Sequence, residues 1–153
     1  MSSGYFAIQV LLCANNRPVL NDVTSAELAL ILQRASAASQ VIADALAGGR
    51  LECLDSGQGS PCLDLTKLNQ KVTDAMKKNG GVDLLVLEGM GRAVHTNLFA
   101  EFKCECLKVA VLKNRWLANK LGGDMYAVIF RYEAPPQGGS TAGAAAKSGR
   151  DEA

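Results

Sequence analysis

The stretch Val82-Asp-Leu-Leu-Val-Leu-Glu-Gly-Met-Gly-Arg-Ala-Val-His-Thr-Asn97 decides the fold prediction. Its first part is a short, uninterrupted run of leucine and valine, which is typical of a buried strand in a parallel sheet. A carboxylate, two glycines, the only histidine of the chain and an amide follow directly. Ligands of open α/β sheets bind beyond the carboxyl ends of the strands. The stretch therefore predicts an α/β fold with a polar pocket at the end of a strand.

The residues of this pocket suit a phosphorylated ligand. Gly89 and Gly91 would let backbone N–H groups approach a ligand closely, and Arg92 carries a planar fork of donors that matches a phosphate. His95 is a candidate general acid or base because its unperturbed pKa lies near neutrality. The alternative is a glycine turn beside a solvated arginine and a structural histidine.

Strand-like and helix-like patterns alternate along the chain, which indicates βαβ units. Strands are predicted at residues 7–13, 51–54, 84–87, 108–112 and 126–131. Helices are predicted from the capping box Thr24-Ser-Ala-Glu27 to Gly48, and over residues 64–78, 98–104 and 114–121. The fold class is thus α/β, with a three-layer, mostly parallel Rossmann-like sheet and flanking helices. Because the chain opens almost at once on a strand, we expect this sheet to be incomplete at the N-terminus.

Composition sets the domain organisation. The chain has 153 residues, of which 48% are hydrophobic, enough for one core. We predict one domain over residues 6–135. From Gln137 onward no apolar residue is larger than alanine, so residues 136–153 are predicted to be a disordered tail.

Charge and cysteine usage limit the classes of partner. The net charge is +1 with acids and bases interspersed, so neither nucleic acid nor a membrane surface is an expected partner. No signal peptide and no apolar run of roughly 18 residues occurs, which predicts a cytoplasmic location. The cysteines are odd in number, and Cys13 and Cys53 lie in apolar runs. They are interpreted as small buried side chains rather than disulfide partners or zinc ligands.

Two further polar positions follow predicted strands. Asp22 lies just before the capping-box Thr24, where its carboxylate could face a cation; the alternative is that Asp22 or Asn21 caps the helix. Lys113 comes directly after the fourth strand, at the start of a helix, and both features favour an anion. The glycine-rich segment 56–62 matches no phosphate-loop spacing and is interpreted as a pocket wall.

Several motifs in the same order resemble the metal-dependent damage-control phosphatases, and the branch with the greatest resemblance is the phosphopantetheine phosphatases. This branch also occurs as the C-terminal half of some pantothenate kinases. The resemblance covers roughly residues 10–135 and rests on Ala14-Asn15-x-x-Pro18-x-Leu20-Asn21-Asp22-Val23-Thr24, Ser60-Pro61-Cys62-Leu63-Asp64-Leu65, Glu88-Gly-Met-Gly-Arg92-x-x-His95-Thr96-Asn97 and Leu112-Lys113-Asn114.

This resemblance implies an activity and a set of site residues. The family hydrolyses phosphomonoesters with a divalent cation such as manganese, nickel or cobalt. Asp22 resembles the aspartate that closes the metal site, and Lys113 resembles the lysine that holds the phosphate; both are the predicted catalytic residues. The predicted substrate-binding residues are Gly89, Met90, Gly91, Arg92, His95, Asn97 and Lys113.

The chain departs from the family at the metal site. The adjacent Asp-Asn pair that the family places upstream of Asp22 does not precede it here. Two functions therefore stay open. The first is a phosphatase acting on a small phosphorylated metabolite, such as phosphopantetheine or its damaged derivatives, in coenzyme A metabolism. The second is a non-catalytic binding or regulatory module associated with a pantothenate kinase domain. A third reading, a nucleotide-binding α/β domain, lacks any glycine-rich nucleotide motif after a strand.

Overall fold

The computed structural model describes residues 8–136, which form two compact units. The first unit, described over residues 8–60 and 67–78, is called the β1–β2 unit. The second, described over 61–66 and 79–136, is called the β3–β5 unit. The α/β class is confirmed. The predicted tail lies outside the described residues, except for Pro136.

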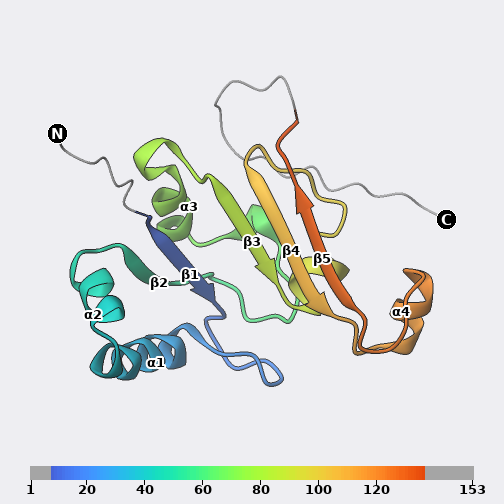
Figure 1. The fold of residues 1–153 in the computed structure, drawn as a ribbon, viewed down its shortest axis with the longest axis horizontal. Coiled ribbons are helices and arrows are strands. Elements are labelled where there is room, and N and C mark those ends of the chain that lie inside the picture. Colours follow the sequence, from blue (N-terminus) through green and yellow to red (C-terminus); the bar gives the residue numbers. More distant parts are fainter. Residues whose placement is uncertain (1–7, 137–153) are drawn as a thin grey trace. The chain divides into compact units, whose positions relative to one another are not determined.

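The β1–β2 unit is a βαβ arrangement (Figure 1). Strand β1 (Val10–Ala14) and strand β2 (Leu51–Asp55) pair in parallel, with Val10 opposite Leu51 and Ala14 opposite Asp55. Between them run helices α1 (Ser25–Ala38) and α2 (Gln40–Ala47). One continuous helix was predicted here; the structure breaks it at Ser39, whose extended backbone (φ −139°, ψ 114°) cannot continue a helix.

Local signals define the ends of these helices. Thr24 is the N-cap of α1, and its side chain accepts a hydrogen bond from the backbone N–H of Glu27 (3.2 Å). The Glu27 carboxylate in turn accepts one from the backbone N–H of Thr24 (2.8 Å), which completes the predicted capping box. Gly48 is the C-cap of α2, as predicted. Thr24, and neither Asn21 nor Asp22, therefore caps α1.

The second predicted helix is shorter than expected. Helix α3 (Gln70–Lys77) begins only at Gln70, because the Asn69 side chain caps it by accepting from the backbone N–H of Lys71 (3.0 Å). A separate 3₁₀ turn, η1 (Leu65–Lys67), precedes it. A further 3₁₀ turn, η2 (Lys78–Gly80), follows α3. Val72 and Ala75 of α3 pack with Leu54 of β2 to form the core cluster of the β1–β2 unit.

The β3–β5 unit is built on a three-stranded sheet. Strand β3 (Leu84–Glu88) pairs in parallel with β4 (Glu105–Val111), and β5 (Val128–Glu133) pairs with β4 in the antiparallel direction. Helix α4 (Arg115–Lys120) lies where β4 ends and β5 begins (Figure 1). The described strands thus form two separate sheets, with β5 antiparallel, and the single three-layer sheet stays a prediction.

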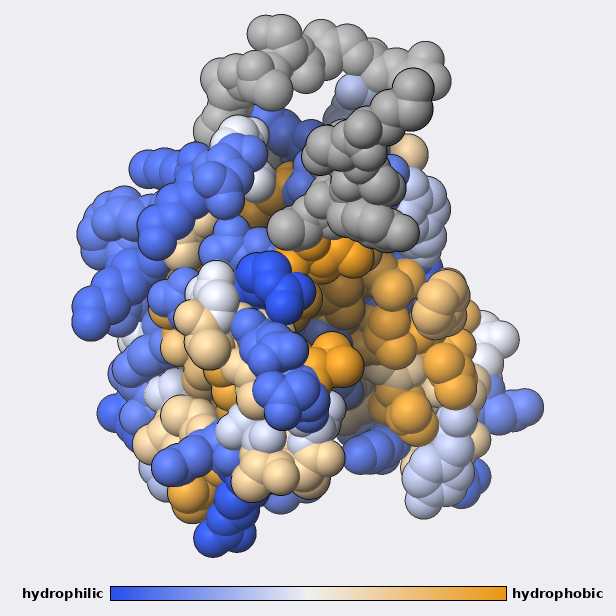
Figure 2. Space-filling view, turned by 60° about the vertical axis from the view of Figure 1, so that its left-hand side comes forward, coloured by the Kyte–Doolittle hydropathy of each residue, from blue (hydrophilic) through white to orange (hydrophobic). Residues whose placement is uncertain are grey.

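One face of this second sheet carries the core. The cluster contains the apolar residues Leu87, Ala93, Val94, Leu98, Cys106, Ala110, Leu112, Leu117 and Ala118. Ile129 of β5 packs against this core, whereas Phe130 and Tyr132 lie on the other face of β5 and are 71% and 55% exposed. Large apolar areas are visible at the surface of the space-filling view (Figure 2).

Two sequence predictions about local structure are wrong. Residues 98–104 form no helix; a π-helical segment, η3 (Met90–His95), lies before them. Cys13 is exposed and Cys53 only partly buried, although both were expected to be buried. An apolar run identifies a strand, but it does not say which face of that strand is covered.

Candidate functional site

All the predicted substrate-binding residues except Lys113 lie in the segment that follows β3, called here the 89–97 loop. Gly89 has a φ of 104°, a conformation that favours glycine, and its backbone N–H donates to the carbonyl oxygen of Val109 (2.9 Å). The backbone N–H of Ala93 donates to the Gly89 carbonyl oxygen (2.8 Å), so the chain turns immediately into η3. π-helical turns of this kind are rare and often occur at functional sites.

Gly91 is required by a close approach rather than by its own backbone angles. A Cβ atom at this position would collide with the carbonyl oxygen of Pro61. Any other residue would therefore push η3 away from the 61–66 segment. This contact gives the second glycine of the motif a packing role within the β3–β5 unit.

Asn97 closes the loop from its buried position, with 5% of its surface exposed. Its side-chain amide lies within donor distance of the carbonyl oxygens of Arg92 (2.7 Å) and Leu63 (3.1 Å), and of the Thr96 hydroxyl (2.9 Å). Asn97 thus ties η3 to the 61–66 segment. Its predicted contact with substrate stays a prediction.

Charged side chains of the loop are more accessible. Arg92 is half-buried, whereas Glu88 and His95 are exposed. Lys113, also exposed, follows the end of β4, and Asn114 caps α4 by accepting from the backbone N–H of Leu117 (3.0 Å). Because β3 and β4 are parallel, the 89–97 loop and Lys113 follow the same edge of the sheet, as the sequence predicted.

Asp22, the predicted metal ligand, belongs to the β1–β2 unit. It is half-buried, and its backbone N–H donates to the carbonyl oxygen of Val19 (3.0 Å) in a tight turn. Thr24, and not Asp22, is the N-cap of α1. In the same unit Ser56 is buried after β2, and its backbone N–H donates to the Ala14 carbonyl oxygen (2.9 Å).

The chain was compared with known protein families. Residues 1–129 match the damage-control phosphatase ARMT1-like domain. The chain belongs to this family.

Three relatives of this damage-control phosphatase-like chain are informative. A 4'-phosphopantetheine phosphatase of Mus musculus is 35% identical in an alignment of 173 positions. This alignment covers 83% of the present chain and 21% of the relative. Pantothenate kinase 2 of Oryza sativa subsp. japonica is 41% identical over 150 residues (84% and 16%). A damage-control phosphatase of Arabidopsis thaliana is 35% identical over 124 residues (81% and 33%). This chain thus spans 16% to 33% of the length of these relatives.

The donor set of this family member does not fit a complete metal site. Within residues 8–136, histidine, cysteine, aspartate and glutamate side chains form no group of three or more that could hold a metal ion. Hard divalent cations need several oxygen ligands, and Asp22 is one carboxylate. We therefore assign no step of a reaction to a metal held by the described residues alone.

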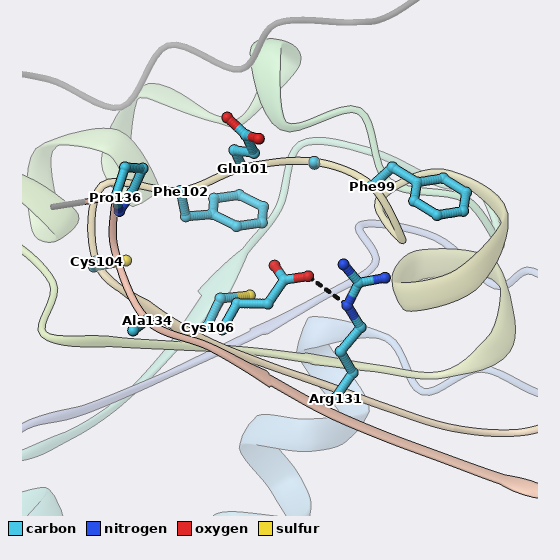
Figure 3. A pocket seen from close by; sticks show the side chains of 10 residues that line it. Phe99, Glu101, Phe102, Cys104, Cys106, Arg131, Ala134 and Pro136 are labelled. Carbon is cyan, nitrogen blue, oxygen red and sulfur yellow. Dashed lines mark ion pairs between the residues drawn. The ribbon is translucent and has the colours of Figure 1, made fainter.

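A hollow of about 530 Å³ lies elsewhere in the β3–β5 unit (Figure 3). Phe99, Phe102 and Cys106 line it together with Arg131 and Glu133. These residues come from the start of β4, the end of β5 and the segment before β4. The segment before β4 that lines the hollow directly follows the 89–97 loop, but none of the predicted site residues lines it.

Sequence reasoning missed the most deeply buried polar residue among residues 8–136. Lys108 is completely buried in β4, and an alternating apolar strand gives no sign that a lysine in it will be paired. The only signal was its place in the run Cys106-Leu-Lys-Val-Ala-Val, where every second residue faces the core.

Among residues 8–136, no helix is long and apolar enough to cross a membrane.

Proposed function

We propose that this chain forms the phosphate-binding part of a phosphatase domain that acts on phosphomonoesters such as phosphopantetheine and its damaged derivatives. The observation that supports this most is the glycine loop after β3 in a chain of the damage-control phosphatase family. The relative named 4'-phosphopantetheine phosphatase supports the substrate class. The three-layer sheet that the sequence predicts is part of the same proposal.

Arg92 and Lys113 are the proposed phosphate ligands of this site. Arginine and lysine side chains are generally cationic at neutral pH, and these two follow the ends of neighbouring parallel strands. A phosphate monoester carries up to two negative charges, and hydrogen bonds from cations to such an anion are the strongest that a protein makes. Backbone N–H groups near Gly89 and Gly91 would complete the cradle.

A divalent cation such as manganese, nickel or cobalt is the proposed cofactor, with Asp22 as one of its ligands. It would supply charge neutralisation at the phosphoryl group. Asp22 alone is a weak site for such an ion. Hydrolysis therefore requires ligands beyond those gathered in residues 8–136.

A second function is favoured by the same shortage of ligands. The chain would then be a non-catalytic module that binds the phosphorylated metabolite beside a pantothenate kinase domain. Relatives from Oryza sativa and Arabidopsis thaliana that carry the name pantothenate kinase 2 support this association. The two functions share the phosphate site and differ in turnover.

The test measures binding and turnover separately on the full chain. Phosphopantetheine affinity is measured by calorimetry with a chelator present, and phosphate release is measured with manganese, cobalt or nickel. Lys113→Ala should weaken binding about 10- to 100-fold, because a hydrogen bond to a charged group contributes about 1.5–3 kcal/mol. Lys120→Ala, on the exposed surface of α4, is the matched control.

Cation-dependent release that Asp22→Asn reduces would support the phosphatase, and Asp74→Asn on α3 is its control. Binding without release would favour the regulatory module. An affinity that Lys113→Ala leaves unchanged would remove the phosphate site from this edge of the sheet. If the chain neither binds phosphopantetheine nor releases phosphate from it, the proposed function is wrong.

A further inference from the structure

A buried lysine connects the sheet of the β3–β5 unit to the segment that follows the 89–97 loop. The Lys108 side chain has no exposed surface. Its ammonium nitrogen Nζ donates to the carbonyl oxygens of Leu98 (2.9 Å) and Ala100 (2.8 Å), and to Oε2 of Glu133 (2.7 Å). A lysine ammonium has three donor hydrogens. All three therefore have partners.

Glu133 is shared between two cations. Its other carboxylate oxygen, Oε1, lies 2.6 Å from Nε of Arg131, the ion pair drawn dashed in Figure 3. The Arg131 guanidinium lies 5.8 Å from the ring centre of Phe99, toward which it points in the same view. Lys108 Nζ lies 5.5 Å from the ring centre of Phe102. The cluster thus holds residues 98–102 against β4 and β5 through both ionic and aromatic contacts.

Hydrogen bonds continue from this cluster into the 89–97 loop. Leu98, whose carbonyl oxygen Lys108 holds, directly follows Asn97, and the backbone N–H of Ala100 donates to the Asn97 carbonyl oxygen (3.2 Å). The Asn97 side chain in turn contacts the Arg92 and Leu63 carbonyl oxygens. A continuous set of bonds therefore runs from Glu133 on β5 to Arg92 in η3.

We infer that Lys108 is a positioning residue, which fixes the 89–97 loop by holding the two carbonyl oxygens just after it. The segment 98–104 has no helix or strand of its own to satisfy these carbonyls. Buried carbonyl groups without a donor are costly, so their partner decides where the segment lies. The consequence for ligand binding rests on the proposed function, whereas the ordering of the loop does not.

A purely structural lysine would behave differently from a positioning one. Removing one partner of a buried ion pair destabilises a protein because the other charge stays buried, but replacing both partners by apolar residues often restores stability. Restoring stability in this way does not restore the donor that the Leu98 and Ala100 carbonyls need. Loop order and global stability should therefore separate in a double variant.

The test uses three variants of the full chain: Lys108→Met, Lys108→Met with Glu133→Leu, and Glu133→Gln. Backbone hydrogen exchange at Ala93 and Ala100 reports on the loop, exchange in β4 reports on the sheet, and the melting temperature reports on global stability. Lys120→Met on the exposed surface of α4 is the control.

We expect Lys108→Met to speed exchange at Ala93 and Ala100 by tenfold or more and to lower the melting temperature. The double variant should recover most of the melting temperature while exchange stays fast and phosphopantetheine affinity stays reduced. Glu133→Gln, which keeps both Lys108–carbonyl bonds, should lower the melting temperature but leave loop exchange within about twofold of the wild type.

Recovery of slow loop exchange in the double variant would overturn the inference, since Lys108 would then matter only through its charge. The inference would also be overturned if Glu133→Gln speeded exchange in the loop as much as Lys108→Met does. If Lys108→Met does not fold, the double variant and Glu133→Gln still distinguish a positioning role of Lys108 from a purely structural one. If the wild type binds no phosphopantetheine but the exchange pattern holds, the proposed function fails while the positioning role stands.

Discussion

The two compact units of this chain differ in how their helices are stabilised. In the β3–β5 unit, η3 and α4 contribute buried residues such as Ala93 and Leu117 to one core with the sheet. In the β1–β2 unit, neither α1 nor α2 has a fully buried residue, and Ile31 is 54% exposed. Packing therefore dominates for η3 and α4, as it does for α3 of the β1–β2 unit, which buries Val72 and Ala75. For α1, the hydrogen bonds of the capping box contribute a larger share.

The largest loss of stability is expected from a substitution in the core of the β3–β5 unit. Leu112→Ala, at a residue that is 1% exposed, should destabilise the β3–β5 unit by about 2–5 kcal/mol, because it leaves a cavity. Ile31→Ala on α1 should cost about 1 kcal/mol or less. Urea unfolding followed by the fluorescence of Trp116, the only tryptophan, reports on the β3–β5 unit.

Equal losses from Leu112→Ala and Ile31→Ala would contradict the difference between the two units. Far-UV circular dichroism, which follows α1 and α2 as well as the sheets, shows whether the units unfold together. A shift in the fluorescence transition alone would indicate that only the β3–β5 unit is affected.

The next effect concerns the glycine loop. Gly91→Ala should destabilise the β3–β5 unit by about 1–3 kcal/mol, because the new methyl group would collide with the Pro61 carbonyl oxygen and displace η3. Gly123→Ala is the matched control, since its Cβ would lie 3.4 Å from that of Ala127, an ordinary contact. Thermal unfolding of both variants measures the difference; similar melting temperatures would mean that η3 tolerates the displacement.

The smallest effect is expected at the cap of α1. Thr24→Ala should cost about 1 kcal/mol, because it removes the acceptor for the Glu27 backbone N–H. Ser36→Ala, whose hydroxyl donates to the Gln33 carbonyl oxygen on the exposed side of α1, should have a smaller effect. Circular dichroism at 222 nm during urea unfolding compares them, and no loss in Thr24→Ala would show that packing holds α1.

The same cap predicts a dependence on pH. The hydrogen bond from the Thr24 backbone N–H lowers the pKa of Glu27 below its ordinary value of 4.5. A lowered folded-state pKa adds stability that is complete above the ordinary pKa and is lost as the pH falls through the lowered one. Glu27→Gln should remove this acid-dependent loss, measured by melting between pH 6 and pH 3. An unchanged pH profile would exclude Glu27 as its source.

Much of the fold followed from local patterns in the sequence. Each of the five predicted strands overlaps an observed one, and Thr24 and Gly48 mark helix ends where the patterns placed them. Caps and turns depend on a few neighbouring residues, so a single sequence contains the information needed. The family likewise followed from short motifs, and the match over residues 1–129 confirms it.

The interior of the candidate site did not follow in this way. The sequence placed Gly89, Arg92 and Lys113 after parallel strands, and the pairing of β3 with β4 agrees with that placement. It did not predict η3, or that Asn97 would contact the carbonyl oxygens of Arg92 and Leu63. Those contacts join residues up to 34 positions apart.

Local patterns specify the strands, the capping box, the glycine turns and the family, because each depends on neighbouring residues or on a short motif. The antiparallel direction of β5, the packing of Gly91 on Pro61 and the burial of Lys108 with Glu133 depend on contacts between residues far apart in the sequence. For Lys108 the cause is desolvation, because a charge removed from water must find its partners wherever the fold brings them. Lys108 and Glu133 are 25 residues apart and meet only because β4 and β5 pair.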